Sequence, residues 1–166
     1  MARKNNDTKK VLKGLSKYLE NVEKVTLGKS LIDFLLINSP PICNYCCKKC
    51  FTLTYASPST KDALNLTEIL SLIKESKKLG ARVVCILGEG EPLLWENIKK
   101  IIGYIHQLGM ISLIATNGSL LTKKMTNFLF THDTTIVISL DTLNEKKYND
   151  FTGGKLSKVL ENIAYV

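Results

Sequence analysis

Short apolar segments alternate with amphipathic segments four times along this chain of 166 residues. The apolar segments have the length of strands, and the amphipathic ones repeat their hydrophobic residues at helical spacing. This alternation is typical of parallel βα units, because parallel strands need long crossover connections that are usually helices. We therefore predict an α/β fold with about four parallel βα units. The predicted strands cover 30–38, 81–87, 110–116 and 134–140, and the predicted helices cover 65–79, 95–108, 121–130 and 155–166.

Each predicted strand is apolar on both faces, which predicts a sheet that is covered rather than exposed to water. Two of the predicted helices also carry recognisable N-terminal caps. Asn65 with Glu68 forms a capping-box pattern, and Thr122 is placed to cap the third helix.

The N-terminal residues differ in character from the rest. Residues 8–25 predict an amphipathic helix rich in lysine, and most of the net charge of +8 lies in the first 50 residues. We predict two regions, a basic helical arm over 1–30 and a βα core over 31–166. Such an arm can contact nucleic acid, anionic lipid or an acidic partner, or simply be solvated.

No apolar run follows the N-terminus, and no segment approaches the length of a membrane span. We therefore expect a cytoplasmic protein, in which clustered cysteines bind metal more often than they form disulfides. The sequence ends where a further strand is due. This predicts a missing C-terminal portion or self-association through the open edge of the sheet.

Four of the five cysteines lie within residues 40–51, which we call the cysteine loop: Cys43, Cys46, Cys47 and Cys50. They can be two adjacent C-x-x-C pairs, which is a zinc pattern, although pairs without a spacer wrap poorly around one ion. Alternatively, Cys43, Cys47 and Cys50 can each bind one iron of a cubane and leave the fourth iron open. On spacing alone, an iron–sulfur cluster, zinc and no metal all remain possible.

The unusual residues of the chain follow the predicted strands. The cysteine loop follows the first strand, "GEGEP" (88–92) the second, "TNGS" (116–119) the third and "SLDT" (139–142) the fourth. In parallel βα architectures the loops after the strands gather on one face and carry the site. We therefore expect these four loops to meet.

The C-x3-C-x2-C motif, with "GEGEP" on the next loop, resembles the radical S-adenosylmethionine superfamily. "ATNGSLL" and "ISLDTLNEKKYNDFTGGKLSKVLENI" resemble the third and fourth segments of its branch of molybdenum-cofactor cyclase-like and SPASM-type enzymes. The likeness covers about residues 31–166. It implies a partial (βα) barrel, of which this chain would supply four of six units.

The resemblance also implies two cofactors, a [4Fe–4S] cluster and S-adenosylmethionine. Three irons would be bound by Cys43, Cys47 and Cys50, and S-adenosylmethionine would bind the fourth. The family pattern matches the S-adenosylmethionine site to seven further residues: Gly90, Glu91, Pro92, Thr116, Asn117, Ser139 and Asp141. No catalytic side chain is identified.

The implied reaction is reductive cleavage of S-adenosylmethionine to a 5′-deoxyadenosyl radical, which abstracts hydrogen from a peptide or small-metabolite substrate. The implied electron donor is a reductase such as flavodoxin or ferredoxin. The family usually has an aromatic residue before the third cysteine, where this chain has Lys49. The alternatives are a non-catalytic iron–sulfur or zinc module and a radical enzyme that acts on nucleic acid.

Overall fold

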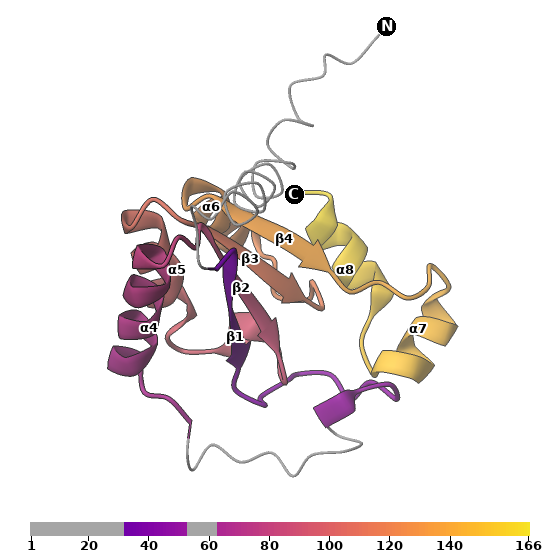
Figure 1. Cartoon of the computed structure of the whole chain (residues 1–166). Coiled ribbons are helices and arrows are strands. Elements are labelled where there is room, and N and C mark those ends of the chain that lie inside the picture. Colours follow the sequence, from indigo (N-terminus) through magenta and orange to yellow (C-terminus); the bar gives the residue numbers. More distant parts are fainter. Residues whose placement is uncertain (1–31, 53–62) are drawn as a thin grey trace, which may run out of the picture.

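Four parallel strands form one sheet in the order β1-β2-β3-β4, as Figure 1 shows. The computed structural model describes residues 32–52 and 63–166. The strands are β1 Phe34–Ser39, β2 Val83–Gly88, β3 Ile111–Thr116 and β4 Thr134–Ile138. Neighbours in sequence are therefore neighbours in the sheet, as in the wall of a (βα) barrel. The predicted α/β class with four parallel units is confirmed, whereas the predicted helix over 8–25 lies outside the described residues.

The register of the sheet aligns the carboxyl ends of the strands. Ser39 at the end of β1 pairs with Gly88 at the end of β2, and Thr116 of β3 pairs with Ile138 of β4. The loops that follow the strands consequently leave from one edge, which we call the carboxyl edge.

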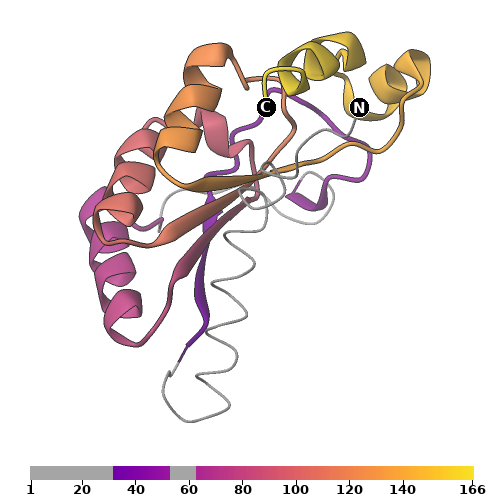
Figure 2. The ribbon, with the colours of Figure 1, turned by 90° about the horizontal axis from the view of Figure 1, so that it is seen from above.

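Three helices pack on one face of the sheet: α4 Leu66–Lys78, α5 Ile98–Gln107 and α6 Lys123–Thr131. Figure 2 shows them in one layer beside the strands. The apolar stripe of α5, which includes Ile101, Ile102 and Ile105, is fully buried. With Val84, Ile86 and Ile114 of the sheet it forms the main core. Burial of this apolar area is the largest favourable contribution to folding.

The opposite face of the sheet is less covered than the sequence predicts. Phe34, Leu36 and Val137 are 41%, 47% and 45% exposed. In the part of the chain that the structure describes, α4, α5 and α6 all lie on the other face. In a barrel wall the helices surround the outside, and the second face of each strand points to the interior. Apolar residues on both faces of a strand therefore do not require helices on both faces.

Both predicted caps are confirmed. The side chain of Asn65 accepts from the backbone N–H of Glu68 at 3.1 Å, and the Glu68 carboxylate accepts from the N–H of Asn65 at 2.8 Å. Thr122 accepts from the N–H of Met125 at 3.2 Å. The predicted helix over 95–108 begins later, because the short 3-10 helix η1 Pro92–Leu94 and a turn precede it.

Two helices follow β4 at the carboxyl edge. Helix α8 Leu156–Ile163 was predicted, but α7 Glu145–Thr152 was not. Only Tyr148 and Thr152 of α7 are buried, so the segment lacks the apolar stripe that identifies a helix from sequence.

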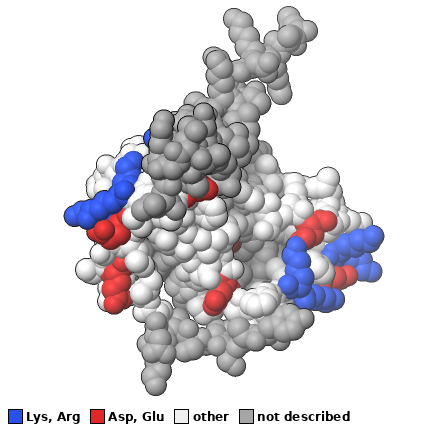
Figure 3. Space-filling view, viewed as in Figure 1, with Lys and Arg blue, Asp and Glu red and all other residues white. Residues whose placement is uncertain are grey.

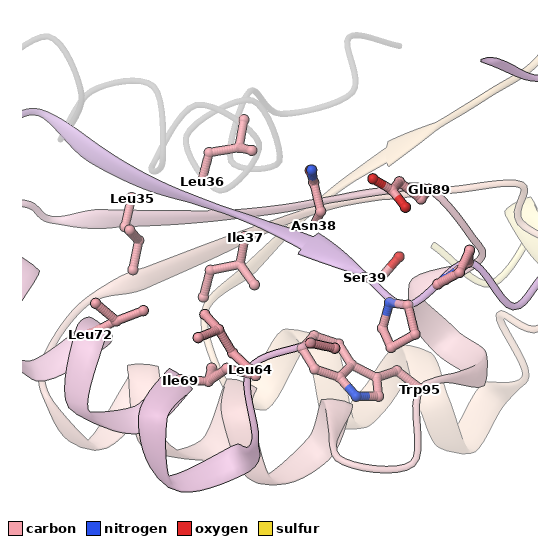
Figure 4. A pocket seen from close by; sticks show the side chains of 13 residues that line it. Leu35, Leu36, Ile37, Asn38, Ser39, Leu64, Ile69, Leu72, Glu89 and Trp95 are labelled. Carbon is pink, nitrogen blue, oxygen red and sulfur yellow. The ribbon is translucent and has the colours of Figure 1, made fainter. Parts of the chain in front are cut away.

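A pocket lies beside β1, one of the two edge strands of the described sheet. Figure 4 shows its lining near the carboxyl end of the strand, where Ser39 lies near Trp95 and Glu89. The hydroxyl of Ser39 is buried and has no hydrogen-bond partner. A Cβ built on Gly88 would lie 2.2 Å from this oxygen, so the strand pair tolerates only glycine there without rearrangement.

No helix within residues 32–52 and 63–166 is both long enough and apolar enough to cross a membrane.

The capping box of α4 provides a test of the fold. Replacing Asn65 by Ala removes the acceptor for the Glu68 N–H, so we expect the free energy of unfolding to fall by about 1 kcal/mol. Asn65→Ser keeps an oxygen at this position and should change stability much less. Urea unfolding followed by circular dichroism measures both, and equal losses in the two variants would contradict the capping role.

Candidate functional site

The four loops at the carboxyl edge are joined by hydrogen bonds, and the cysteine loop contacts each of the others. Figure 1 shows it leaving β1 and running past the edge of the sheet towards α7. Its contacts begin with the backbone. The N–H of Glu91 donates to the carbonyl of Ile42 at 2.8 Å, and the N–H of Cys46 donates to the carbonyl of Thr152 at 3.1 Å.

Three of the four thiols in this loop, those of Cys43, Cys47 and Cys50, lie close enough to influence one another's pKa. Burial raises the pKa of Cys43, and the charges of Glu91 and Cys50 raise it further. Burial also raises the pKa of Cys47, to which the neighbouring thiols of Cys43 and Cys50 add. A thiolate binds metal, so a cationic metal centre would favour deprotonation of these thiols.

The fourth thiol points elsewhere. Cys46 lies against the turn between α7 and α8, where a Cβ built on Gly153 would be 2.7 Å from its Sγ. The structure thus separates Cys46 from the three cysteines of the C-x3-C-x2-C motif. This placement agrees with the predicted ligand set, which itself stays a prediction.

In the described ranges, no group of three or more His, Cys, Asp or Glu side chains is arranged to hold one metal ion. A tetrahedral zinc site requires such convergence on a single ion. A cubane does not, because each thiolate binds a different iron. Three thiols in one loop, each able to bind a different iron, are compatible with a [4Fe–4S] cluster.

Gly90 brings the second loop into close contact with the cysteine loop. A Cβ built on Gly90 would lie 2.2 Å from the carbonyl oxygen of Pro40 and 2.4 Å from that of Ile42. Any other residue would push the two loops apart. Pro92 follows as the first residue of η1 and is buried.

The carboxylate of Glu91 is buried and fully engaged. Its Oε1 accepts from the hydroxyl of Thr116 at 2.6 Å and from the N–H of Leu93 at 3.1 Å. Its Oε2 accepts from the N–H of Asn117 at 2.8 Å. The side chain therefore ties the loop after β2 to the loop after β3. Burial raises the pKa of Glu91, although the three hydrogen bonds partly oppose the rise.

Asn117 hydrogen-bonds both to Glu91 and to the cysteine loop. Its Nδ2 donates to the Oδ1 of Asn44 at 3.0 Å and lies 4.0 Å from the Sγ of Cys43. Asn44 in turn donates to the hydroxyl of Ser119 at 2.9 Å. Asn44 and Ser119 were not predicted as site residues, because an amide inside a cysteine motif has no distinctive spacing.

The loop after β4 contacts both the end of β3 and the cysteine loop. The N–H of Ser139 donates to the carbonyl of Thr116 at 2.9 Å. Asp141 forms an ion pair with Lys49, the residue that stands in place of the family's aromatic. The ammonium group of Lys49 also lies 5.7 Å from the centre of the Phe151 ring. Every residue that the sequence assigned to the site is thus on one edge of the sheet.

The charged side chains around this edge are of both signs. Figure 3 shows lysines next to acidic groups at the α7 end of the molecule. Besides the Lys49–Asp141 pair, Lys158 pairs with Glu161 at 3.1 Å. The carboxylate of Glu145 accepts from the N–H groups of Leu156 and Ser157, at the start of α8.

The raised pKa of Glu91 predicts how stability depends on pH. A carboxyl group whose pKa is raised by folding stabilises the fold most below its unfolded pKa, and this contribution is lost as the pH rises through the folded value. Relative to Glu91→Gln, the metal-free chain should therefore lose stability as the pH rises from about 4. Urea unfolding of both proteins over a pH series measures this difference. If the stability of the unsubstituted chain instead rises with pH relative to that of Glu91→Gln, the assignment is wrong.

Comparison with known proteins identifies the family. The model of the Radical SAM superfamily matches residues 37–166. A GTP 3′,8-cyclase of Alkaliphilus oremlandii (strain OhILAs) is 36% identical over 136 residues, which cover 80% of this chain and 42% of that protein. The chain thus spans less than half the length of this curated relative.

Two solved structures of Streptococcus suis SuiB share the fold. SuiB bound to the precursor peptide SuiA matches with a TM-score of 0.70 at 25% identity, over 89% of this chain and 33% of that chain. SuiB bound to S-adenosylmethionine matches with a TM-score of 0.67 at 23% identity, over 99% of this chain and 36% of that chain. Since the family model matches more than half of the chain, this protein belongs to the radical S-adenosylmethionine superfamily.

Proposed function

We propose that residues 31–166 form the part of a radical S-adenosylmethionine enzyme that binds its [4Fe–4S] cluster and S-adenosylmethionine, and that residues 1–30 are an accessory arm. Enzymes of this superfamily bind both cofactors. The observation that carries the proposal for this chain is the placement of three neighbouring thiols beside the "GEGEP" loop, with Cys46 turned away.

The residues present fit the two cofactors. Cys43, Cys47 and Cys50 would each bind one iron, and the fourth iron would be open to the amino and carboxylate groups of S-adenosylmethionine. Burial raises the pKa of Cys43 and of Cys47, and both thiols would lose their protons on binding iron. Asn117 adds a hydrogen-bond donor near Cys43, of the kind that tunes a cluster through its sulfur ligands.

The carboxylate of Glu91 is held inside the protein, which favours a structural role over direct contact with S-adenosylmethionine. Both of its carboxylate oxygens already accept hydrogen bonds, and the residue is 3% exposed. We propose that backbone carbonyls of 88–92 accept from the methionine amino group instead. Gly90 permits the close approach this requires, and Glu91 holds the loop in place. Ser139 and Asp141 are exposed. The hydroxyl of Ser139 can donate to a carboxylate, and the carboxylate of Asp141, which also pairs with Lys49, can accept from ribose hydroxyls.

A reduced cluster held by Cys43, Cys47 and Cys50 would supply one electron for cleavage of S-adenosylmethionine to methionine and a 5′-deoxyadenosyl radical, which would take a hydrogen atom from the substrate. The electron would come from a reduced flavodoxin or ferredoxin. This chain would position the two cofactors relative to each other.

The substrate that we propose is a small metabolite or a peptide. The 36% identity to a GTP 3′,8-cyclase favours a small molecule, and GTP is the first compound to test. The SuiB complex with a precursor peptide keeps the peptide class in the proposal. Action on nucleic acid is less well supported, because lysines at the carboxyl edge are interspersed with acidic groups and two of them are in ion pairs.

Iron binding tests the ligand set. After anaerobic reconstitution, we expect about four irons per chain and the charge-transfer absorbance of a cluster. Cys43→Ala, Cys47→Ala and Cys50→Ala should each lose most of this iron, because each removes the only protein ligand of one iron. Cys46→Ala is the matched control, since it removes a thiol from the same loop. Iron loss in Cys46→Ala equal to that in Cys47→Ala would refute the assignment, as would zinc binding without iron uptake.

Binding of S-adenosylmethionine tests the loop after β4. In the reconstituted chain, we expect Asp141→Asn to weaken binding by about tenfold, the effect of losing one charge-assisted hydrogen bond. Asp150→Asn removes an exposed carboxylate from α7 and should leave binding unchanged. Anaerobic calorimetry measures both, and 5′-deoxyadenosine formation with dithionite, with and without GTP, tests turnover. Equal affinities in the two variants would remove Asp141 from the site.

A further inference from the structure

The cysteine loop rests on a part of the chain that the cluster motif does not include. The carbonyls of Phe151 and Thr152, at the C-terminal end of α7, accept from the N–H groups of Lys48 and Cys46 at 2.8 Å and 3.1 Å. The last carbonyls of a helix have no partner within the helix, so they are available to accept from another segment. Two backbone amides between the cluster cysteines are thereby fixed in direction.

Side chains reinforce this backbone contact. Tyr45 packs edge-to-face on Tyr148 of α7, with ring centres 6.4 Å apart. Tyr148 is 1% exposed and forms a small core with Leu156 and Val159 of α8. Burial raises the pKa of Tyr148, and the neighbouring Tyr45 raises it further. The cysteine loop is therefore attached to the α7–α8 unit by an aromatic side chain as well as by two hydrogen bonds.

Two glycines make room for the loop, and we call Gly153 and Gly154 the glycine turn. A Cβ built on Gly154 would lie 2.2 Å from the Tyr45 ring, and one built on Gly153 would lie 2.7 Å from the Sγ of Cys46. Gly153 also has a φ of 73°, which favours glycine. Neither glycine could carry a side chain without displacing the cysteine loop or bending its residues away.

We infer that the glycine turn, together with Tyr45 and Tyr148, positions the cysteine loop so that Cys43, Cys47 and Cys50 face one side while Cys46 faces the turn. These are positioning residues, since none of them would touch iron. The inference rests on the proposed function for its link to the cluster, but the docking itself is a property of the metal-free chain. Outer residues that orient metal ligands typically change metal affinity by about 10- to 100-fold when they are mutated.

The test begins without metal. In the full chain, we expect Gly154→Ala to raise the hydrogen-exchange rates of the Cys46 and Lys48 amides by about tenfold or more, as local opening of a docked loop does. Gly103→Ala is the matched control. Gly103 lies in α5, has no positive φ, and a Cβ there would meet nothing within 4 Å. In the Gly103→Ala variant, the amides of Cys46 and Lys48 should exchange at the same rates as in the unsubstituted chain.

A double-mutant cycle identifies the contact responsible. Tyr45→Ala removes the ring that a Cβ at 154 would meet, so Gly154→Ala should add little to Tyr45→Ala in either amide exchange or iron retention. Tyr45→Ala alone should loosen the loop without introducing any clash. If Gly154→Ala does not fold by circular dichroism, Tyr45→Ala carries the test by itself.

After anaerobic reconstitution, a chelator should remove iron about tenfold faster from Gly154→Ala and Tyr45→Ala than from Gly103→Ala. If the unsubstituted chain takes up no iron, the proposed function fails, whereas the amide exchange still decides the docking. The inference is overturned if the Cys46 and Lys48 amides exchange equally fast in the unsubstituted chain and in both loop variants. It is also overturned if both variants retain iron as the control does.

Discussion

A single buried carboxylate connects the parts of this site. Glu91 accepts hydrogen bonds from the hydroxyl of Thr116 and from the backbone of Leu93 and Asn117, while its own N–H donates to Ile42. It thereby joins the loops after three different strands. Burying a carboxylate is unfavourable unless donors surround it, so the three donors and the carboxylate depend on one another. A change at any of them leaves a polar group unsatisfied in the interior and loosens the site.

Most of the fold follows from the sequence because its signals are local. The four strands, the helices on one face and the caps at Asn65 and Thr122 depend on apolar periodicity and on short capping patterns. Helix α7 was missed because it has no apolar stripe of its own, although Asn144 at its N-cap and Gly153 after its last residue are local helix signals.

The position of the site could be predicted from the sequence, but the hydrogen bonds and ion pairs between its residues could not. Parallel topology alone brings the cysteine loop, Gly90, Asn117 and Asp141 to one edge, and the resemblance to the superfamily assigned their expected ligands. The sequence could not reveal that both carboxylate oxygens of Glu91 accept hydrogen bonds from the protein itself. Nor could it reveal the hydrogen bond between Asn44 and Asn117. Such partners depend on the register of the sheet and on side-chain directions, which no short motif encodes. The ion pair of Lys49 with Asp141 likewise joins residues from loops far apart in the chain.

The docking of the cysteine loop on α7 also constrains the order of events during synthesis. Contacts between residues distant in sequence form late, because the intervening chain must first be made and closed into a loop. The cysteines leave the ribosome early, whereas the helix end that fixes their loop leaves near the end of the described chain. A nascent chain would thus expose reactive thiols until α7 and the glycine turn have emerged. Cluster insertion is consequently expected after translation of this region, onto a folded scaffold rather than onto the growing chain.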